Sequence, residues 1–277
     1  MKRVSFPYKA LAGIDLWQGA AKGLNYVCAG DGPPMILLHG GVASWRHWVR
    51  NIGALSRHFR VYAVDQPGMG ESLDMPKNTD IGPFMDALVS GVDAMIPSRE
   101  RFHMDGFSLG GLTGAGVAAR LADRTLSLAM IMPGGFKPGQ VNRLETPAVT
   151  SGMSDEEIND LHRRNLLTLL LADPASIDDE TVAIQRYNIE HARYNGRSIA
   201  FGDHLGAFLP KVRCPKLLLV GEKDVLPAPN VQARIDYVKA LAPDVESHVI
   251  PGAGHWAIYE RPDLVNRYLI EFAQRHR

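Results

Sequence analysis

Short apolar runs alternate with longer amphipathic runs along most of the chain, and this alternation limits the fold more than any other feature. The short runs show little polar alternation, which is typical of parallel strands covered on both faces. The longer runs carry apolar residues at helical spacing and suit crossover helices. The sequence therefore predicts an α/β fold, a mostly parallel sheet with helices on both faces. The expected strands are 35–38, 60–64, 102–104, 126–132, 216–220 and 247–250. The expected helices are 83–95, 109–121, 231–241 and 263–274. Residues 11–17 and 24–28 are expected to form an antiparallel pair of strands ahead of them.

The alternation stops after Met132, where Pro133-Gly134-Gly135 opens roughly seventy residues without a strand signal. Two helical runs are expected inside this segment, the first behind the capping-box sequence Ser154-Asp-Glu-Glu157 and the second behind residues 176–180. Because the segment interrupts the sheet pattern, we interpret residues 135–205 as a helical cap, or lid, inserted after the sixth predicted strand. Residues 1–134 and 206–277 then form the core. A second autonomous domain would follow the sheet pattern instead of interrupting it.

The charge and cysteine content narrow the classes of partner. Thirty basic and thirty acidic residues balance, so no broad positive field exists to hold nucleic acid or an anionic membrane. The first residues contain no apolar run long enough for a signal peptide or a membrane span, so the expected location is the cytoplasm. Cys28 and Cys214 form no metal-binding or disulfide pattern. The expected partner is a small-molecule substrate, and a homodimer is left open.

A G-x-S-x-G motif, Gly106-Phe-Ser-Leu-Gly110, lies between a predicted strand and a predicted helix. In that context the motif predicts a serine held on a sharp turn, which requires neighbours without bulky side chains. We therefore predict Ser108 as a nucleophile and the Leu109 N–H, at the helix N-terminus, as a donor to the developing oxyanion. His39-Gly40-Gly41 follows another predicted strand, and the Gly41 N–H is the expected second donor.

A serine nucleophile needs a base and a third group that orients the base. His255 is the expected base because it lies in a glycine-rich loop directly after the last predicted strand. Asp224 ends a buried-strand pattern and is the expected orienting acid, with Glu222 as a rival two residues earlier. Asp65 also ends a strand, but we expect it to shape a tight turn. The sequence shows no metal-ligand cluster or phosphate-binding loop, so no metal or organic cofactor is expected.

These motifs, together with Asp65-Gln-Pro-Gly-Met-Gly-Glu-Ser72, make the chain resemble the α/β-hydrolase superfamily over essentially its whole length. A narrower, partial resemblance is to the meta-cleavage-product hydrolases, which cut a carbon–carbon bond in vinylogous 1,5-diketones from aromatic degradation. It rests on Arg50-Asn51, on Gly254-His255-Trp256 and on residues 172–186. This resemblance implies that Asn51, Arg186 and Trp256 contact an acidic dienol substrate. The alternative for Arg186 is a solvated helix charge paired with Glu190.

Two departures from that narrower family leave the reaction open. Residues 42–45 replace a Gly-Pro-Gly oxyanion loop, and Phe107 replaces a polar Asn before the serine. Phe107, with Trp45 and Trp48 nearby in the sequence, favours a hydrophobic acyl or aromatic pocket, and we expect Phe107 to contact substrate. Hydrolysis of a small carboxylic ester and cleavage of a diketone carbon–carbon bond are thus both candidates. The alternatives are a non-hydrolysing ligand-binding protein and a perhydrolase or lyase that uses the same triad.

Overall fold

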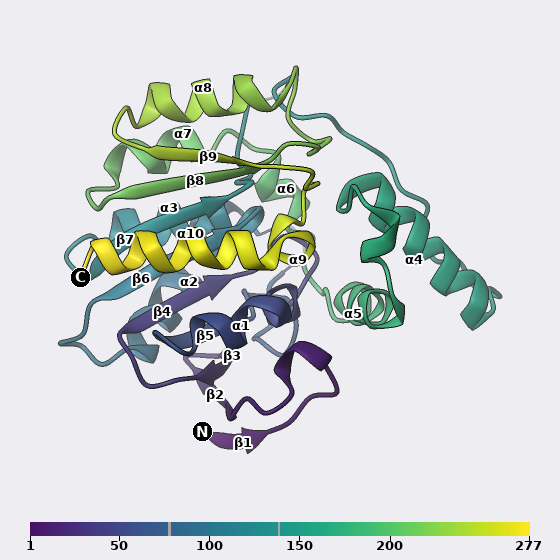
Figure 1. Cartoon of the computed structure of the whole chain (residues 1–277), viewed down its shortest axis with the longest axis horizontal. Helices are drawn as coiled ribbons and strands as arrows, with labels where there is room; N and C mark the ends of the chain where they lie inside the picture. The colour runs from purple at the N-terminus through teal and green to yellow at the C-terminus, as the bar shows by residue number, and fades with distance from the viewer. Residues whose placement is uncertain (77–78, 138) are drawn as a thin grey trace.

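A nine-stranded sheet forms the centre of the computed structural model, which describes residues 1–76, 79–137 and 139–277. Its spatial order is β1-β2-β3-β5-β4-β6-β7-β8-β9. The pairs β1–β2, β2–β3 and β3–β5 are antiparallel and the remaining pairs are parallel (Figure 1). The strands are β1 (Lys2–Val4), β2 (Leu16–Ala21), β3 (Leu24–Ala29), β4 (Pro34–Leu38), β5 (Arg60–Val64), β6 (Phe102–Phe107), β7 (Thr125–Ile131), β8 (Lys216–Gly221) and β9 (Glu246–Ile250).

Helices cover both faces of the sheet, as the amphipathic runs predicted. One face packs against α2 (Ile81–Met95), α3 (Leu109–Arg120) and α8 (Val231–Leu241). The other packs against α1 (Val49–Leu55), α9 (Ala257–Glu260) and α10 (Pro262–Arg275). Short 3-10 turns η1 (Lys9–Leu11) and η2 (Trp45–Trp48) join the second group. The predicted fold class, an α/β sheet of mostly parallel strands with helices on both faces, is confirmed.

Successive residues of the central strands point into different cores because side chains alternate along a strand. In β4, Ile36 and Leu38 belong to the core under α2 and α3, whereas Met35 and Leu37 belong to the core under α1 and α10. All four are fully buried. Burial on both faces explains why the central strands read as continuous apolar runs in the sequence.

The strand count ahead of the insertion differs from the prediction by one. Residues 2–4 pair with β2, and a three-residue strand carries almost no sequence signal. The first strand of the predicted lead-in pair begins at Leu16 instead of Leu11, and residues 9–11 form a 3-10 turn. The insertion therefore follows the seventh strand, not the sixth.

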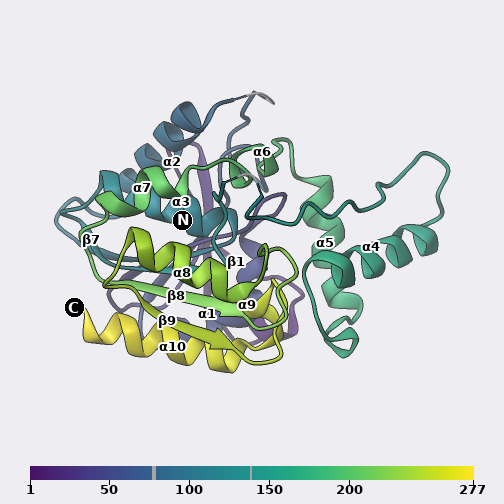
Figure 2. The same cartoon turned by 90° about the horizontal axis from the view of Figure 1, so that it is seen from above.

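The segment between β7 and β8 carries α4 (Asp155–Leu169), η3 (Pro174–Ser176), α5 (Asp179–Glu190), α6 (Arg197–Ala200), α7 (Leu205–Phe208) and η4 (Leu209–Lys211). Figures 1 and 2 show α4 and α5 projecting beyond one end of the sheet. The predicted capping box at Ser154 and Glu157 begins α4. A second capping box, between Asp178 and Thr181, begins α5. That residues 135–205 act as a lid stays a prediction.

The strand order places the predicted chemical groups at one edge. Parallel strands β4, β6, β8 and β9 end at the same side of the sheet, and ligands of open α/β sheets bind outside these carboxyl ends. The loops after these strands carry, in turn, Gly41, Ser108, Asp224 and His255.

Candidate active site

Ser108 lies on a strained turn between β6 and α3. Its φ is 54° and its ψ is −114°, a conformation that costs a residue with a side chain about 1–3 kcal/mol. The turn is tight enough that a Cβ on Gly106 would lie 2.0 Å from the Gly110 carbonyl oxygen. A Cβ on Gly110 would lie 2.2 Å from the Leu38 carbonyl oxygen. Both glycines of the motif are therefore required by close backbone approach.

Three side chains from three loops meet in one hydrogen-bonded row. The His255 Nε2 lies 3.0 Å from the Ser108 Oγ, and the His255 Nδ1 lies 2.8 Å from the Asp224 Oδ2. An ionised carboxylate only accepts hydrogen bonds, so Nδ1 carries the proton and Nε2 is free to accept the serine proton. His255 and Asp224 are both buried. This arrangement can remove a proton from Ser108 as the hydroxyl attacks.

The Asp224 carboxylate is held in its charged form. Burial opposes ionisation, but the neighbouring His255 and the Leu226 N–H, 3.0 Å from Oδ1, lower the pKa of Asp224 below its ordinary value. The rival Glu222 instead accepts the Gly252 N–H at 2.7 Å. Of the two candidate acids, Asp224 is the one in contact with His255.

Asp65 accepts hydrogen bonds from three segments of the chain. Its carboxylate accepts the N–H groups of Trp45 at 2.7 Å and Glu71 at 3.0 Å and the side-chain amide of Asn25 at 2.8 Å. Burial raises the pKa of Asp65, and these three donors oppose that rise. The contacts agree with the structural role expected from the sequence.

The loop that carries Gly41, one of the two expected oxyanion donors, is braced by a neutral histidine. The His39 Nδ1 lies 2.7 Å from the Gly40 carbonyl oxygen, and its Nε2 accepts the Gln66 N–H at 2.9 Å. Burial lowers the pKa of His39 to about 4, so it is uncharged at neutral pH. Gly41 lines the cavity that contains Ser108, and Leu109, as the first residue of α3, has an N–H that the helix does not use.

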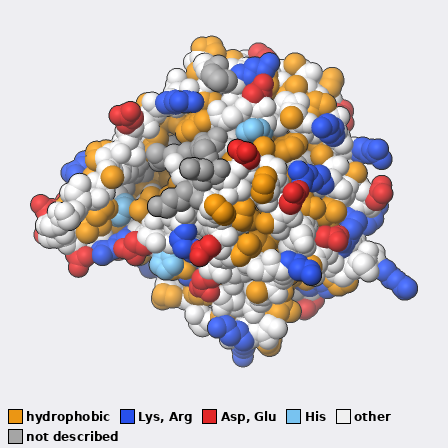
Figure 3. Space-filling model, turned by 180° about the vertical axis from the view of Figure 1, so that it is seen from behind, with side chains coloured by type: hydrophobic (Ala, Val, Ile, Leu, Met, Phe, Trp, Pro, Cys, Tyr) orange, Lys and Arg blue, Asp and Glu red, His pale blue; other side chains and the backbone are white. Residues whose placement is uncertain are grey.

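The cavity beside Ser108 has a volume of about 650 Å³. Its lining combines Gly41, Ser108 and His255 of the core with residues of α4, α5 and the 141–146 segment. Much of its lining is apolar, including Val42, Phe107, Leu144, Leu169, Leu170 and Leu226. Its charged side chains are Arg143, Glu145 and Arg234. Elsewhere, basic and acidic side chains are interspersed on the molecular face seen in Figure 3.

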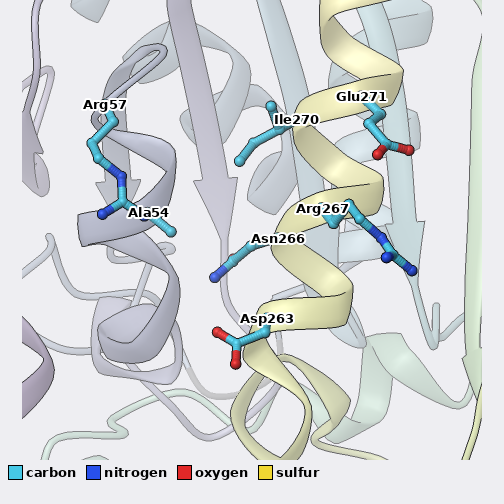
Figure 4. Close-up of a pocket in the computed structure, with 7 residues that line it drawn as sticks. All are labelled: Ala54, Arg57, Asp263, Asn266, Arg267, Ile270 and Glu271. Carbon is cyan, nitrogen blue, oxygen red and sulfur yellow. The ribbon is translucent and has the colours of Figure 1, made fainter.

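Asn51 does not lie at this cavity. Its side-chain amide donates to the Ile258 carbonyl oxygen at 3.0 Å and to the Asn266 Oδ1 at 2.9 Å. Asn266 belongs instead to the lining of a separate cavity of about 290 Å³ beside α10 (Figure 4). The expectation that Asn51 contacts substrate is therefore corrected: Asn51 joins α1 to the α9–α10 region.

Arg186 and Trp256 are likewise placed outside the cavity lining. Arg186 pairs with Glu190 at 2.9 Å and with Asp155 at 2.8 Å, which matches the solvated alternative given above. Trp256 is fully buried and donates from its Nε1 to the His47 carbonyl oxygen at 3.2 Å. Its expected substrate contact is corrected to a supporting position behind His47. Phe107 does line the cavity, and its contact with substrate stays a prediction.

The polar residues of the cavity lining that were not predicted include His47, Arg143 and Arg234. Arg234 is buried and donates to the carbonyl oxygens of Pro133 at 2.9 Å and Gln140 at 3.2 Å. Burial lowers the pKa of Arg234 to about 10. No motif marks these residues, because their direction depends on how a 3-10 turn, a loop and a helix pack.

In residues 1–76, 79–137 and 139–277, no group of three or more His, Cys, Asp and Glu side chains is arranged to hold a metal ion. No described helix combines the length and the apolar character needed to cross a membrane. Cys28 and Cys214 are buried free thiols, and burial raises the pKa of each to about 11.

The family comparison and the structural comparison point to the same fold. Residues 35–268 match the Alpha/beta hydrolase family. A 2-hydroxy-6-oxononadienedioate/2-hydroxy-6-oxononatrienedioate hydrolase of Comamonas testosteroni is 27% identical over 88% of both chains. An uncharacterized carboxylesterase of Bacillus subtilis is 27% identical over 87% of this chain and 79% of its own. The crystal structure of naproxen esterase from Bacillus subtilis superposes with a TM-score of 0.73 at 24% identity, covering 95% of this chain and 94% of that one, and it shares the fold.

Proposed function

The chain belongs to the alpha/beta hydrolase family, and from that premise we propose that it is a serine hydrolase of small carboxylic esters. Ser108 acts as the nucleophile, His255 as the general base and Asp224 as the orienting acid. The observation that carries the proposal is the continuous hydrogen-bonded row from Ser108 through His255 to Asp224 at the wall of a cavity. A hydroxyl with this partnership becomes reactive at neutral pH.

The proposed reaction begins when an ester carbonyl carbon lies beside the Ser108 Oγ, with its oxygen facing the Gly41 and Leu109 N–H groups. As Oγ attacks, its proton passes to the His255 Nε2, and the two amides stabilise the oxyanion. Asp224 stabilises the resulting imidazolium. His255 then returns the proton to the leaving alcohol as the acyl–oxygen bond breaks. A water molecule, activated by His255, finally releases the acid from Ser108.

The apolar lining supports esters over acidic diketones. Phe107 and several leucines would contact an acyl or aromatic group by excluding water. The narrower resemblance implies that Arg186 and Asn51 contact a dienol acid. Arg186 instead pairs with Glu190 and Asp155, and Asn51 donates to Asn266. The similarity to a carboxylesterase fits the same choice.

A carbon–carbon bond hydrolase is the second candidate, and one observation favours it. Arg143 and Arg234 line the cavity, and Arg234 has no carboxylate among its hydrogen-bond partners in the described residues. Such a cation is suited to hold a substrate carboxylate. The similarity to the Comamonas testosteroni hydrolase, whose name specifies dicarboxylic substrates, points the same way.

The test compares p-nitrophenyl esters of two to eight acyl carbons with a ring-fission dienol acid, for the wild type, Ser108→Ala, Arg234→Met and Arg186→Ala. The proposal predicts ester turnover that Ser108→Ala reduces by at least about 10⁴-fold while the fold is retained. Arg186→Ala is the matched control for the loss of a cavity arginine and should leave the kinetics of both substrates within about twofold.

Four results would overturn the ester proposal. Undiminished ester hydrolysis by Ser108→Ala would remove the mechanism. Faster turnover of the dienol acid, abolished by Arg234→Met alone, would establish the carbon–carbon candidate. Saturable ligand binding without turnover of any substrate would establish a binding protein, and peroxide-dependent acid consumption would establish a perhydrolase.

A further inference from the structure

Val42, the residue after the expected oxyanion donor Gly41, has a backbone conformation that valine rarely adopts. Its φ is 52°, in the left-handed region, where a β-branched residue is strained because its Cβ crowds the following carbonyl oxygen. Val42 also lines the Ser108 cavity. A strained residue keeps such a conformation only when its surroundings hold it, so contacts outside Val42 must fix this turn.

The turn is not held by backbone hydrogen bonds of its own. Among the described residues, the N–H and C=O groups of residues 41–43 make no hydrogen bond. An N–H without a partner in the chain is what an oxyanion donor requires, but the same freedom leaves the turn without local support. Hydrogen bonds flank the turn instead, and on its first side the Gly40 N–H donates to the His47 Nδ1 at 3.4 Å.

On the second side of the turn, the insertion supplies a short hydrogen bond. The Ser44 Oγ donates to the Oδ1 of Asn188, in α5, at 2.6 Å, and both side chains are fully buried. Of the two projecting helices, α5 is the one that lies nearer the core (Figures 1 and 2). The next residue, Trp45, donates its N–H to the Asp65 Oδ1 of the core at 2.7 Å. The insertion and the core therefore fix this end of the turn together.

A second part of the insertion packs directly against the expected oxyanion donors. Gly196 lies just before α6, and a Cβ on Gly196 would lie 3.5 Å from the Gly41 Cα and 2.7 Å from the Leu109 Cδ2. The two residues that it contacts are the ones whose N–H groups face the reacting carbonyl oxygen in the proposed reaction. The insertion thus reaches the oxyanion position at two places, at Gly196 and, through Ser44, at Asn188.

We propose that Asn188 is a positioning residue for the oxyanion donor: by holding Ser44 it keeps Val42 in its strained conformation, and this conformation places the Gly41 N–H beside the reacting carbonyl. The inference rests on the proposed ester hydrolysis and assigns part of its oxyanion site to the insertion. When the hydrogen bond from Ser44 is lost, Val42 relaxes to a negative φ and Gly41 moves with it. A glycine at position 42 populates both regions about equally and has no such driving force.

The test is a double-mutant cycle of Asn188→Ala and Val42→Gly with p-nitrophenyl butyrate as the substrate. The left-handed region disfavours valine by a factor of about five to thirty, so Asn188→Ala should lower kcat by about that factor. KM should change less than about twofold, because the donor acts on the charge that develops in the transition state. In the Val42→Gly background, the same Asn188→Ala change should lower kcat only about twofold.

Tyr259→Phe is the matched control, because the Tyr259 and Thr181 hydroxyl oxygens, 2.8 Å apart, join the other end of α5 to the core. This control should leave kcat unchanged. Ser44→Ala removes the other half of the hydrogen bond and serves in the same cycle if Asn188→Ala does not fold, as judged by circular dichroism and thermal unfolding. An unchanged kcat in the folded variant, equal falls in both backgrounds, or the same fall in Tyr259→Phe would overturn the proposal.

Crystal structures of the wild type and of Asn188→Ala separate this inference from the proposed function, because they require no turnover. The wild type is expected to show Val42 at a positive φ, and Asn188→Ala is expected to show it at a negative φ with Gly41 displaced. That change would support the positioning role even if no ester is hydrolysed. A positive φ at Val42 in both proteins would contradict the positioning role even if ester hydrolysis is confirmed.

Discussion

Asp105 is a buried carboxyl group on β6, three residues before Ser108. Its Oδ2 has no hydrogen-bond partner among the described residues, and burial raises the pKa of Asp105 well above its ordinary value. The unfolded chain releases this proton near the ordinary pKa, whereas the folded chain retains it. Above that pH the unfolded state binds fewer protons, so stability falls as pH rises toward the raised pKa.

Replacing Asp105 by Asn mimics the protonated carboxyl and should remove this loss. The variant is expected to gain stability relative to the wild type between pH 5 and pH 8, with a slope of up to about 1.4 kcal/mol per pH unit within the titration window. Urea unfolding at several pH values measures the difference. Parallel pH profiles for the two proteins would contradict the assignment of a neutral Asp105.

The site residues predicted from the sequence fall into two groups, those positioned by the order of the strands and those positioned by packing between helices. Ser108, Asp224 and His255 follow strands whose ends share one edge, so strand order alone brings their loops together. Asn51 and Trp256 were expected at the substrate, but their directions depend on packing between α1, α9 and α10, which no local pattern encodes. His47 was missed for the same reason.

Among the connecting elements, Glu260 ties the insertion to the loop of His255. Its Oε1 accepts the N–H groups of Ala172 at 2.8 Å and Asp173 at 2.9 Å, and its Oε2 accepts the Gly254 N–H at 2.6 Å. Glu260 itself is buried in α9. One side chain thus joins the segment after α4 to the residue that precedes His255.

Glu260→Ala leaves three N–H donors without their acceptor and should destabilise the fold by about 1–3 kcal/mol or more. Because Gly254 is released, His255 loses part of its support, and kcat should fall at least about tenfold. Glu260→Gln keeps one acceptor oxygen and should lie between the wild type and Glu260→Ala in both measurements. If Glu260→Ala lowers stability but leaves kcat unchanged, the link to His255 is wrong.

The insertion also shows which elements sequence can and cannot define. Its α4 helix was predicted from the capping-box spacing at Ser154, since that signal is local. The direction of α5 was not, so the sequence left Arg186 open between a substrate contact and the solvated pair with Glu190 that the structure has. Contacts such as that between the Ser44 Oγ and the Asn188 Oδ1, at 2.6 Å, fix α5 against the core and join residues 144 positions apart.

For the molecule as a whole, three buried neutral histidines should make stability depend on acid pH. Burial lowers the pKa of His39 and of His103 to about 4, and that of His47 well below its ordinary value. The unfolded chain takes up these protons near pH 6.5, so between pH 6.5 and about 4 the unfolded state binds more protons. Each histidine therefore contributes a loss of stability on acidification.

His103 offers the measurement, because it lies away from the proposed site and contacts the Ser127 Oγ at 2.8 Å. His103→Gln should reduce the loss of unfolding free energy between pH 6.5 and pH 5 by up to about 1.4 kcal/mol per pH unit. The difference between the variant and the wild type cancels the opposing effects of Asp65 and Asp105. An unchanged slope would show that His103 titrates alike in both states.

The central claim is that Ser108 is a nucleophile activated by His255, and covalent labelling tests it most directly. Diethyl p-nitrophenyl phosphate is added to the wild type, Ser108→Ala and His255→Ala, and released p-nitrophenol is counted while peptide mass spectrometry locates the adduct. The account predicts one equivalent of p-nitrophenol and one phosphoryl adduct at Ser108 in the wild type, with no adduct in Ser108→Ala and labelling slowed at least about 10³-fold in His255→Ala. Labelling at another residue, or at an undiminished rate in His255→Ala, would contradict it.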